Sequence, residues 1–209
     1  IGPAFGPIPT LLRQNLSLEG SIIGMLVWFL IGFSIIIAAI LRMSGGTALG
    51  ELLRYTGLGA PSRMGPNIVG VTIGILWSAT FLAGILQFDP DANIAQINGF
   101  RILTVILAAT GTVLEDIITR GYLMNQLREI EVPNWVQAAV SSLLFALYHT
   151  AWAGFNIPAF VFSVVIGLIL AGLFLWGKRS LTPVILAHSI AVIIGEPFAS
   201  MMIFLTANL

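Results

Sequence analysis

Long uncharged stretches alternate with short polar connections along most of the chain. The first runs from Ser21 to Leu41 and the second from Pro66 to Phe88. No charged residue lies between Pro133 and Gly177. This segment is long enough for two further helices with a turn at residues 154–158. Because about 20 apolar residues cross the hydrocarbon core as a helix, the pattern predicts four membrane-spanning helices in these regions.

Two more spans are expected on either side of this uncharged region. Phe100 to about Arg128 reads as one helix of roughly 43 Å at 1.5 Å per residue. Leu181 to Leu209 reads as a sixth span disturbed by Pro197, because proline removes a helical hydrogen bond. If this last span is one helix, His188 lies about 10 Å from its centre, so a meeting with the other polar span residues requires tilted or offset helices.

The connection between the first two spans has its own pattern. Leu49, Leu52 and Leu53 fall on one helical face, and Gly57 follows as a C-cap. This spacing predicts a short interfacial helix lying on the membrane, with an ordinary loop as the alternative. Residues 1–19 read as a Pro/Gly-rich lead without the basic segment of a signal peptide.

Composition supports a membrane protein. The chain is 57% hydrophobic and 9% charged, with a mean hydropathy of +0.99, whereas a soluble domain carries about 25% charged residues. The expected fold is therefore all-α, one polytopic membrane domain over residues 1–209 with about six transmembrane helices and lipid as its surroundings. With a net charge of zero and no basic patch, nucleic acid is not expected as a partner. The absence of cysteine excludes a cysteine nucleophile and a thiolate metal site.

Basic residues orient the predicted spans. They concentrate in the connections after spans one, three and five, namely Arg42, Arg54, Arg63, Arg128, Lys178 and Arg179. The opposite side holds Arg13 and Arg101 with Asp89 and Asp91. Because cytoplasmic loops carry the excess of Lys and Arg, we expect the first set in the cytoplasm and both termini outside.

The third span carries three ionisable residues, Glu115, Asp116 and Arg120. Each charged group costs roughly 2.5–3.5 kcal/mol at the bilayer centre on insertion scales, so such groups usually mark a functional site. Asp116 and Arg120 are i,i+4 neighbours and are expected to pair. Glu115 points about 100° away around the helix and lacks a partner in its own helix. A polar packing cluster without chemistry is the alternative.

Both histidines of the chain lie in apolar spans. Phe145 and His149 are i,i+4, so the phenyl ring can pack on the imidazole, and His188 lies early in the sixth span. A carboxylate with two histidines suits acid–base chemistry in which Glu115 takes a proton from water. The same trio, Glu115, His149 and His188, could instead hold a divalent metal such as Zn²⁺. The sequence leaves these alternatives open.

These residues fall into three ordered motifs: Glu115-Asp116-Ile117-Ile118-Thr119-Arg120 followed by Gly-Tyr-Leu, Phe145-Ala146-Leu147-Tyr148-His149, and His188-Ser189-Ile190-Ala191-Val192. They resemble EExxxR, FxxxH and HxxxN of the CAAX protease and bacteriocin-processing family, also called CPBP or Abi. This family includes the Ras-converting CAAX endopeptidase. The resemblance covers about residues 100–195, the family-like core of the domain.

The resemblance implies a role for each matched residue. Glu115 looks like the general base on water, His149 looks like its partner, and His188 looks like a contributor to the oxyanion site. Asp116, Arg120 and Phe145 look like supporting residues. Two positions depart from the motifs, because Asp116 replaces a glutamate and Val192 stands where the family has asparagine. Valine cannot donate a hydrogen bond, and losing one oxyanion donor typically costs about 10²–10³ in rate.

Two functions follow as hypotheses. The first is an intramembrane endopeptidase that hydrolyses a peptide or prenylated tail in a cavity between the third, fourth and sixth spans. The second is a non-catalytic CPBP-like subunit or scaffold that binds a larger membrane complex, which Val192 favours. A small-molecule transporter is a third class, but the chain shows no inverted repeat. We expect an integral, multi-pass membrane protein in a bacterial-type plasma membrane.

Overall fold

The computed structural model describes residues 7–43, 48–153 and 157–206, and this part of the chain is helical with no strand. The prediction of an all-α fold is therefore confirmed. The helices in chain order are α2 (Pro7–Asn15), α3 (Leu18–Met43), α4 (Leu49–Tyr55), α5 (Met64–Phe88), α6 (Gly99–Asp116), the π-helix η1 (Ile117–Tyr122), α7 (Leu123–Glu129), α8 (Asn134–Ala153), α9 (Ile157–Trp176), α10 (Thr182–Gly195) and α11 (Phe198–Thr206).

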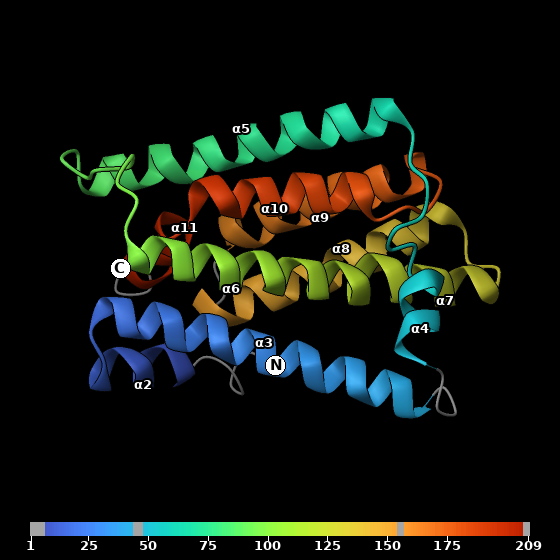
Figure 1. Cartoon of the computed structure of the whole chain (residues 1–209), viewed down its shortest axis with the longest axis horizontal. Coiled ribbons are helices and arrows are strands. Elements are labelled where there is room, and N and C mark those ends of the chain that lie inside the picture. The colour runs from blue at the N-terminus through green and yellow to red at the C-terminus, as the bar shows by residue number, and fades with distance from the viewer. Residues whose placement is uncertain (1–6, 44–47, 154–156, 207–209) are drawn as a thin grey trace.

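The long helices run side by side as a bundle (Figure 1). Among the described residues, four helices are long and apolar enough to cross a membrane: α3, α5, the continuous helix Gly99–Glu129, and α9. The shorter apolar α10 and the 20-residue α8 lie among them and complete an arrangement of about six membrane helices. The chain is thus an integral, multi-pass membrane protein, as predicted.

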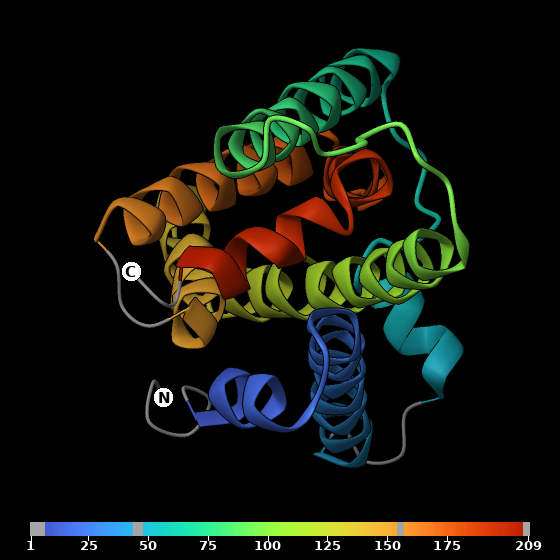
Figure 2. The same cartoon turned by 90° about the vertical axis from the view of Figure 1, so that its left-hand side faces the viewer.

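Three helix boundaries differ from the sequence expectation. The lead contains a helix, α2, because Pro7 and Pro9 fall in its first turn, where proline is tolerated. The sixth span is two helices, because α10 ends at Gly195 and α11 begins after Pro197; Figure 2 shows α11 running across the bundle. The expected turn at residues 154–158 lies partly outside the described residues, and α9 begins at Ile157.

α5 and α10 approach closely because α5 presents glycines to its neighbour. A Cβ on Gly74 would lie 2.6 Å from the carbonyl oxygen of Ala187 and 2.8 Å from Cβ of Ile190, and one on Gly70 would collide with the carbonyl of Pro183. Small residues four apart let membrane helices pack backbone to backbone. This contact fixes where the side chains one turn further along both helices meet.

The predicted interfacial helix forms as α4, and Gly57 after it adopts the left-handed conformation expected of a C-cap (φ +82°). Its placement on the membrane surface stays a prediction, and the structure adds that the helix packs on the protein. Leu52 is buried inside the protein, and the α4 end packs so tightly on η1 that a Cβ on Gly121 would lie 2.5 Å from Thr56 Cβ. The helix therefore closes one end of the bundle.

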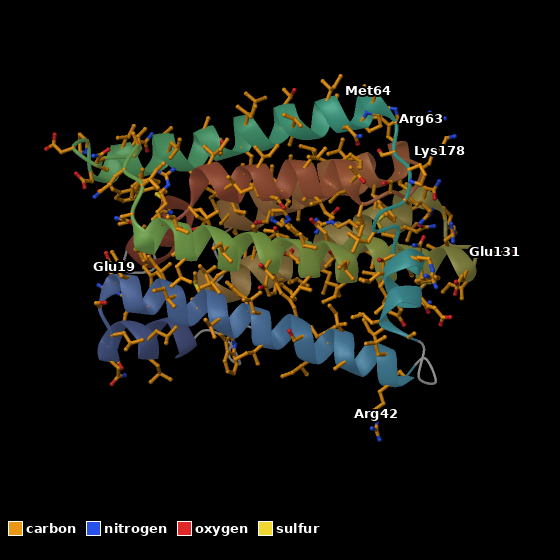
Figure 3. All side chains as sticks on the ribbon, viewed as in Figure 1. Glu19, Arg42, Arg63, Met64, Glu131 and Lys178 are labelled. Atoms are coloured by element: carbon orange, nitrogen blue, oxygen red, sulfur yellow. The ribbon has the colours of Figure 1, made fainter. Side chains whose placement is uncertain are left out.

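The charged connections gather at the ends of the bundle. Figure 3 shows Arg42, Arg63 and Lys178 at one end, with Glu19 at the other. The connection between α5 and α6 lies at the same end as the start of α3 in Figure 1. This separation of the basic connections from the opposite loops matches the charge pattern along the chain, and the cytoplasmic side assigned to the basic end stays a prediction.

Candidate active site

The third membrane helix changes its winding within the site. The chain is α-helical up to Asp116 and π-helical over Ile117–Tyr122. The predicted pair forms, because Arg120 Nη1 donates to Asp116 Oδ1 at 3.0 Å, and both side chains are fully buried. π-helical turns inside α-helices often occur at functional sites.

Arg120 is held on several sides. Its Nη1 also donates to Thr119 Oγ1 at 2.8 Å, and its guanidinium carbon lies 4.3 Å from the centroid of the Phe145 ring. A cation on a ring face is attracted by the ring quadrupole, more strongly when desolvated. Arg120 thus ties the third span to α8 through Phe145, which places this phenyl ring between the charged cluster and the core.

Glu115 lies beside this pair without joining its hydrogen bonds. Its side chain is buried, and Oε1 lies 3.8 Å from Arg120 Nη1 with no hydrogen-bond partner among the described residues. The prediction that Glu115 has no charged neighbour in its own helix is therefore wrong. A π-turn holds about 4.4 residues, so Arg120, five residues on, comes back toward Glu115. The carboxylate has a nearby cation and a free oxygen.

His149 enters from α8 and is packed as the Phe145 spacing predicts. The two ring centroids are 4.0 Å apart. His149 Nδ1 lies 2.9 Å from the Phe145 carbonyl oxygen and 3.8 Å from Glu115 Oε1. A carbonyl oxygen only accepts hydrogen bonds, so Nδ1 carries the proton. In the neutral ring, the other nitrogen, Nε2, is left with a free lone pair.

His188 enters from α10 and makes a contact that the sequence did not reveal. Its Nδ1 lies 3.2 Å from Asp116 Oδ2, so Asp116 joins Arg120 on one side and His188 on the other. Because the carboxylate accepts, His188 Nδ1 is the protonated nitrogen and Nε2 is bare when the ring is neutral. Trp77 of α5 stacks on this imidazole, with centroids 5.1 Å apart and an interplanar angle of 16°.

The three residues singled out from the sequence come together. One ligand atom from each of Glu115, His149 and His188 lies within 4.8 Å of the others. The depth mismatch expected for His188 disappears because α10 ends at Gly195, which puts His188 in the middle of a short helix. Two imidazoles and a carboxylate are a ligand set of divalent metal ions, and the Asp116 contact is of the kind that orients metal-bound histidines.

A cavity of about 380 Å³ opens beside this cluster. Glu115, His149 and His188 line it, together with aromatic rings from α3, α5 and α9. Val192, one turn after His188, lines the same cavity, as expected if the motif residues share a face. The position that the family fills with asparagine therefore presents methyl groups to this space.

Other residues at the cavity were not assigned to the site from the sequence. Tyr148 packs between the rings of Phe29 and Phe33, with centroids 5.3 and 5.2 Å away. Glu196 lies buried at the break before α11, and its Oε2 accepts a hydrogen bond of 3.4 Å from the backbone N–H of Ser200. Trp77 is a third. An aromatic residue in an apolar span reads as core, and only the neighbouring Gly70 and Gly74 indicate that it faces a helix contact.

Comparison with known proteins gives one match. Residues 97–194 match the family described as type II CAAX prenyl endopeptidase Rce1-like. Searches of curated proteins and of solved structures found no match. The matched region begins near the start of α6, ends within α10, and contains all three motifs and every residue of the cluster. The resemblance inferred from the motifs is thus confirmed: over residues 97–194 this chain resembles the CPBP family in its Rce1-like branch.

Proposed function

We propose that this protein is an intramembrane endopeptidase in which Glu115 activates water for hydrolysis of a peptide bond. The observation that carries the proposal is the state of the Glu115 carboxylate. Its Oε1 is buried without a hydrogen-bond partner, and it lies next to two histidines at the wall of a cavity. A buried carboxylate oxygen is costly to leave unsatisfied, and a water held for reaction would satisfy it.

The tautomers inferred above define how the water is held. Glu115 Oε1 and the bare Nε2 of His149 both accept, so one water can donate one hydrogen to each. The ligand atoms of the cluster, counting either nitrogen of each ring, lie within 4.8 Å of one another, and one water with hydrogen bonds of about 2.8 Å can bridge groups at that spacing. Held this way, the water directs an oxygen lone pair into the cavity.

The reaction then follows from general base catalysis. Glu115 takes one proton as the water oxygen bonds to the carbonyl carbon, and the carbonyl electrons move onto its oxygen. When the carbonyl re-forms, the C–N bond breaks and the leaving nitrogen takes the proton from Glu115. The products are a carboxylic acid and an amine. A positioned acid–base group of this kind contributes about 10²–10⁴-fold.

Asp116 and Arg120 have a supporting role in this scheme. Their mutual ion pair holds Asp116 in place, and Asp116 fixes the ring of His188 by accepting from Nδ1. Arg120, 3.8 Å from Glu115, stabilises the carboxylate as the charged form that accepts a proton. Phe145 holds His149 and Arg120 on its two sides.

A divalent metal is compatible with the same residues. Glu115, His149 and His188 would hold it, and when bound it would polarise the carbonyl or lower the pKa of water. The roles of Asp116 and Phe145, which set both histidine tautomers, are the same with or without the ion.

The lining of the cavity supports an apolar substrate. Phe29 and Phe33 of α3, Phe81 of α5 and Phe162 of α9 face the space beside the cluster. Burying such surfaces contributes about 25 cal/mol per Å², which suits a lipid-modified or strongly apolar peptide. The Rce1-like match is to prenyl endopeptidases, and a prenylated C-terminal peptide is therefore the substrate to test first.

The test compares the purified natural chain with Glu115→Gln in lipid nanodiscs, with a prenylated peptide and product detection by mass spectrometry. Glu115→Gln keeps the shape and removes the base, so we expect a loss of about 10²–10⁴-fold in cleavage. Glu51→Gln, the same change at an exposed position on α4, should cleave like the natural chain. Equal cleavage by the Glu115 variant would remove the proposed base.

A non-catalytic subunit is the second candidate, and Val192 is the observation that favours it. An oxyanion needs hydrogen-bond donors, and neither Val192 nor a neutral histidine with Nδ1 already paired supplies one. Purification in mild detergent distinguishes the two functions. A stable stoichiometric membrane complex without Glu115-dependent cleavage would favour the subunit.

A further inference from the structure

Trp77 carries a hydrogen-bond donor that the described structure does not use. Its Nε1 is buried and has no hydrogen-bond partner, and the residue is only 7% exposed. An indole N–H can only donate, and when buried it usually finds an acceptor. A buried donor without one costs stability, so a position that keeps it calls for an explanation.

The position of Trp77 suggests what the acceptor is. The indole stacks on His188, lines the cavity together with Glu115 and Val192, and belongs to α5, outside the three motifs. The glycine contact of α5 with α10 sets this arrangement, because Gly74 lies against Ala187 and Trp77 follows it by three residues. Backbone packing therefore places the start of the Trp77 side chain, and the stack on His188 places its ring.

The two motif positions that the resemblance assigns to the oxyanion site, His188 and Val192, leave the proposed reaction without a donor. The Val192 side chain offers none. His188 Nδ1 is occupied by Asp116, and His149 Nδ1 is occupied by the Phe145 carbonyl, so neutral histidines present only acceptors to the cavity. A carbonyl oxygen that becomes an oxyanion therefore needs a donor from elsewhere. Trp77 supplies an N–H that stays protonated at every pH of interest.

We propose that the Trp77 indole N–H donates a hydrogen bond to the scissile carbonyl oxygen as it becomes an oxyanion, in place of the asparagine that this chain lacks at Val192. The inference rests on the proposed endopeptidase function. No proton is transferred from the indole: the carbonyl electron pair moves onto oxygen when water attacks, the N–H stabilises it, and the pair returns when the C–N bond breaks.

The first experiment removes the N–H and keeps an aromatic ring. We expect Trp77→Phe to lower kcat about 10²–10³-fold, as for loss of one oxyanion donor, with little change in KM. Trp135→Phe is the matched control, because Trp135 is 74% exposed at the start of α8 and away from the cavity. An unchanged kcat in Trp77→Phe would overturn the proposal.

The second experiment returns the missing donor. Val192→Asn should raise the kcat of Trp77→Phe by a much larger factor than it raises the kcat of the natural chain, because the natural chain already has a donor. A role of Trp77 in packing alone would not be rescued by an amide at position 192. An equal gain from Val192→Asn in both backgrounds would mean that the natural site has no donor, and would overturn the proposal.

The third experiment does not depend on turnover or on a folded variant. The natural chain, labelled with ¹⁵N at its indole nitrogens, is titrated with a peptide phosphinate, whose anionic oxygen mimics the oxyanion. The Trp77 N–H proton resonance should move downfield with the phosphinate and not with the matching uncleaved peptide. If the natural chain cleaves nothing, the proposed function fails, while this shift still decides the Trp77 donor. No shift on saturation would overturn it.

Discussion

Two neighbouring carboxylates of the third membrane helix lie in opposite surroundings. Asp116 is fully buried, accepts from Arg120 at 3.0 Å and lies 3.2 Å from His188 Nδ1. Glu115 is almost as buried and lines the cavity, but its Oε1 accepts no hydrogen bond among the described residues. The Asp116 side of the helix is closed in the sense that both carboxylate oxygens are paired, although Arg120 Nε and Nη2 have no hydrogen-bond partner among the described residues. The Glu115 side is open, because Oε1 is unpaired.

The contrast separates holding the fold from performing chemistry. A buried carboxylate whose two oxygens are both paired holds its surroundings in place, whereas a buried oxygen without a partner is costly to keep. Residues on the closed side, Asp116 and Arg120, should therefore affect stability most. Glu115 on the open side and Trp77 of α5 should affect a reaction most, because both residues line the cavity and each keeps an unused hydrogen-bonding atom.

The largest expected effect on stability comes from breaking the closed side. Arg120→Ala leaves Asp116 buried without its main cation, a loss of about 3–5 kcal/mol. The midpoint of thermal unfolding in detergent should fall strongly. Arg54→Ala, at an exposed position of α4, should change stability by about 0.5 kcal/mol or less. Matching midpoints for the two variants would show that Asp116 is solvated.

A smaller effect is expected at the seam that positions Trp77 and His188. Gly74→Ala puts a methyl group 2.6 Å from the Ala187 carbonyl oxygen, so α5 and α10 must separate. Overpacking of this kind typically costs about 1–3 kcal/mol, and cleavage should fall with it. Gly172→Ala in α9 is the control, because a Cβ there meets nothing within 4 Å. If the two variants had equal stability and activity, the contact between α5 and α10 at Gly74 would tolerate an added methyl group, and this prediction would be wrong.

The smallest expected effect on stability and activity comes from variants that test the orientation of the protein in the membrane. These substitutions lie at the ends of the bundle and leave Glu115 and Asp116 unchanged. The chain has no cysteine, so single cysteines can be introduced without a background. Met64→Cys, 74% exposed at the basic end, should be protected from an impermeant thiol reagent in intact cells, and Asn93→Cys on the opposite side should be labelled. The reverse pattern would invert the topology predicted from the basic connections.

Local patterns predicted much of this arrangement. The uncharged stretches predicted the spans, and the i,i+4 spacings predicted the Asp116–Arg120 and Phe145–His149 contacts. The three motifs predicted that Glu115 lies close to both histidines. These succeed because helical geometry relates residues three and four apart regardless of the fold.

The remaining features depend on contacts between distant segments. The π-turn over residues 117–122, the Asp116–His188 contact and the break of the sixth span at residue 195 each depend on how α6, α8 and α10 pack. No local pattern distinguishes a π-turn from an α-turn in this apolar sequence. Trp77 was missed for the same reason, because only packing turns a core aromatic residue into a cavity residue.

One paired measurement tests the division between the two carboxylates. Glu115→Gln and Asp116→Asn are equivalent changes at adjacent residues, and both variants are assayed for unfolding midpoint and for cleavage of a prenylated peptide. We expect Glu115→Gln to keep a midpoint close to that of the natural chain and to lose cleavage by about 10²–10⁴-fold. Asp116→Asn should lose about 3–5 kcal/mol of stability, because Arg120 remains buried with a weakened partner. This account would be contradicted if Glu115→Gln cleaved the peptide as fast as the natural chain, or if the two variants lost equal amounts of stability.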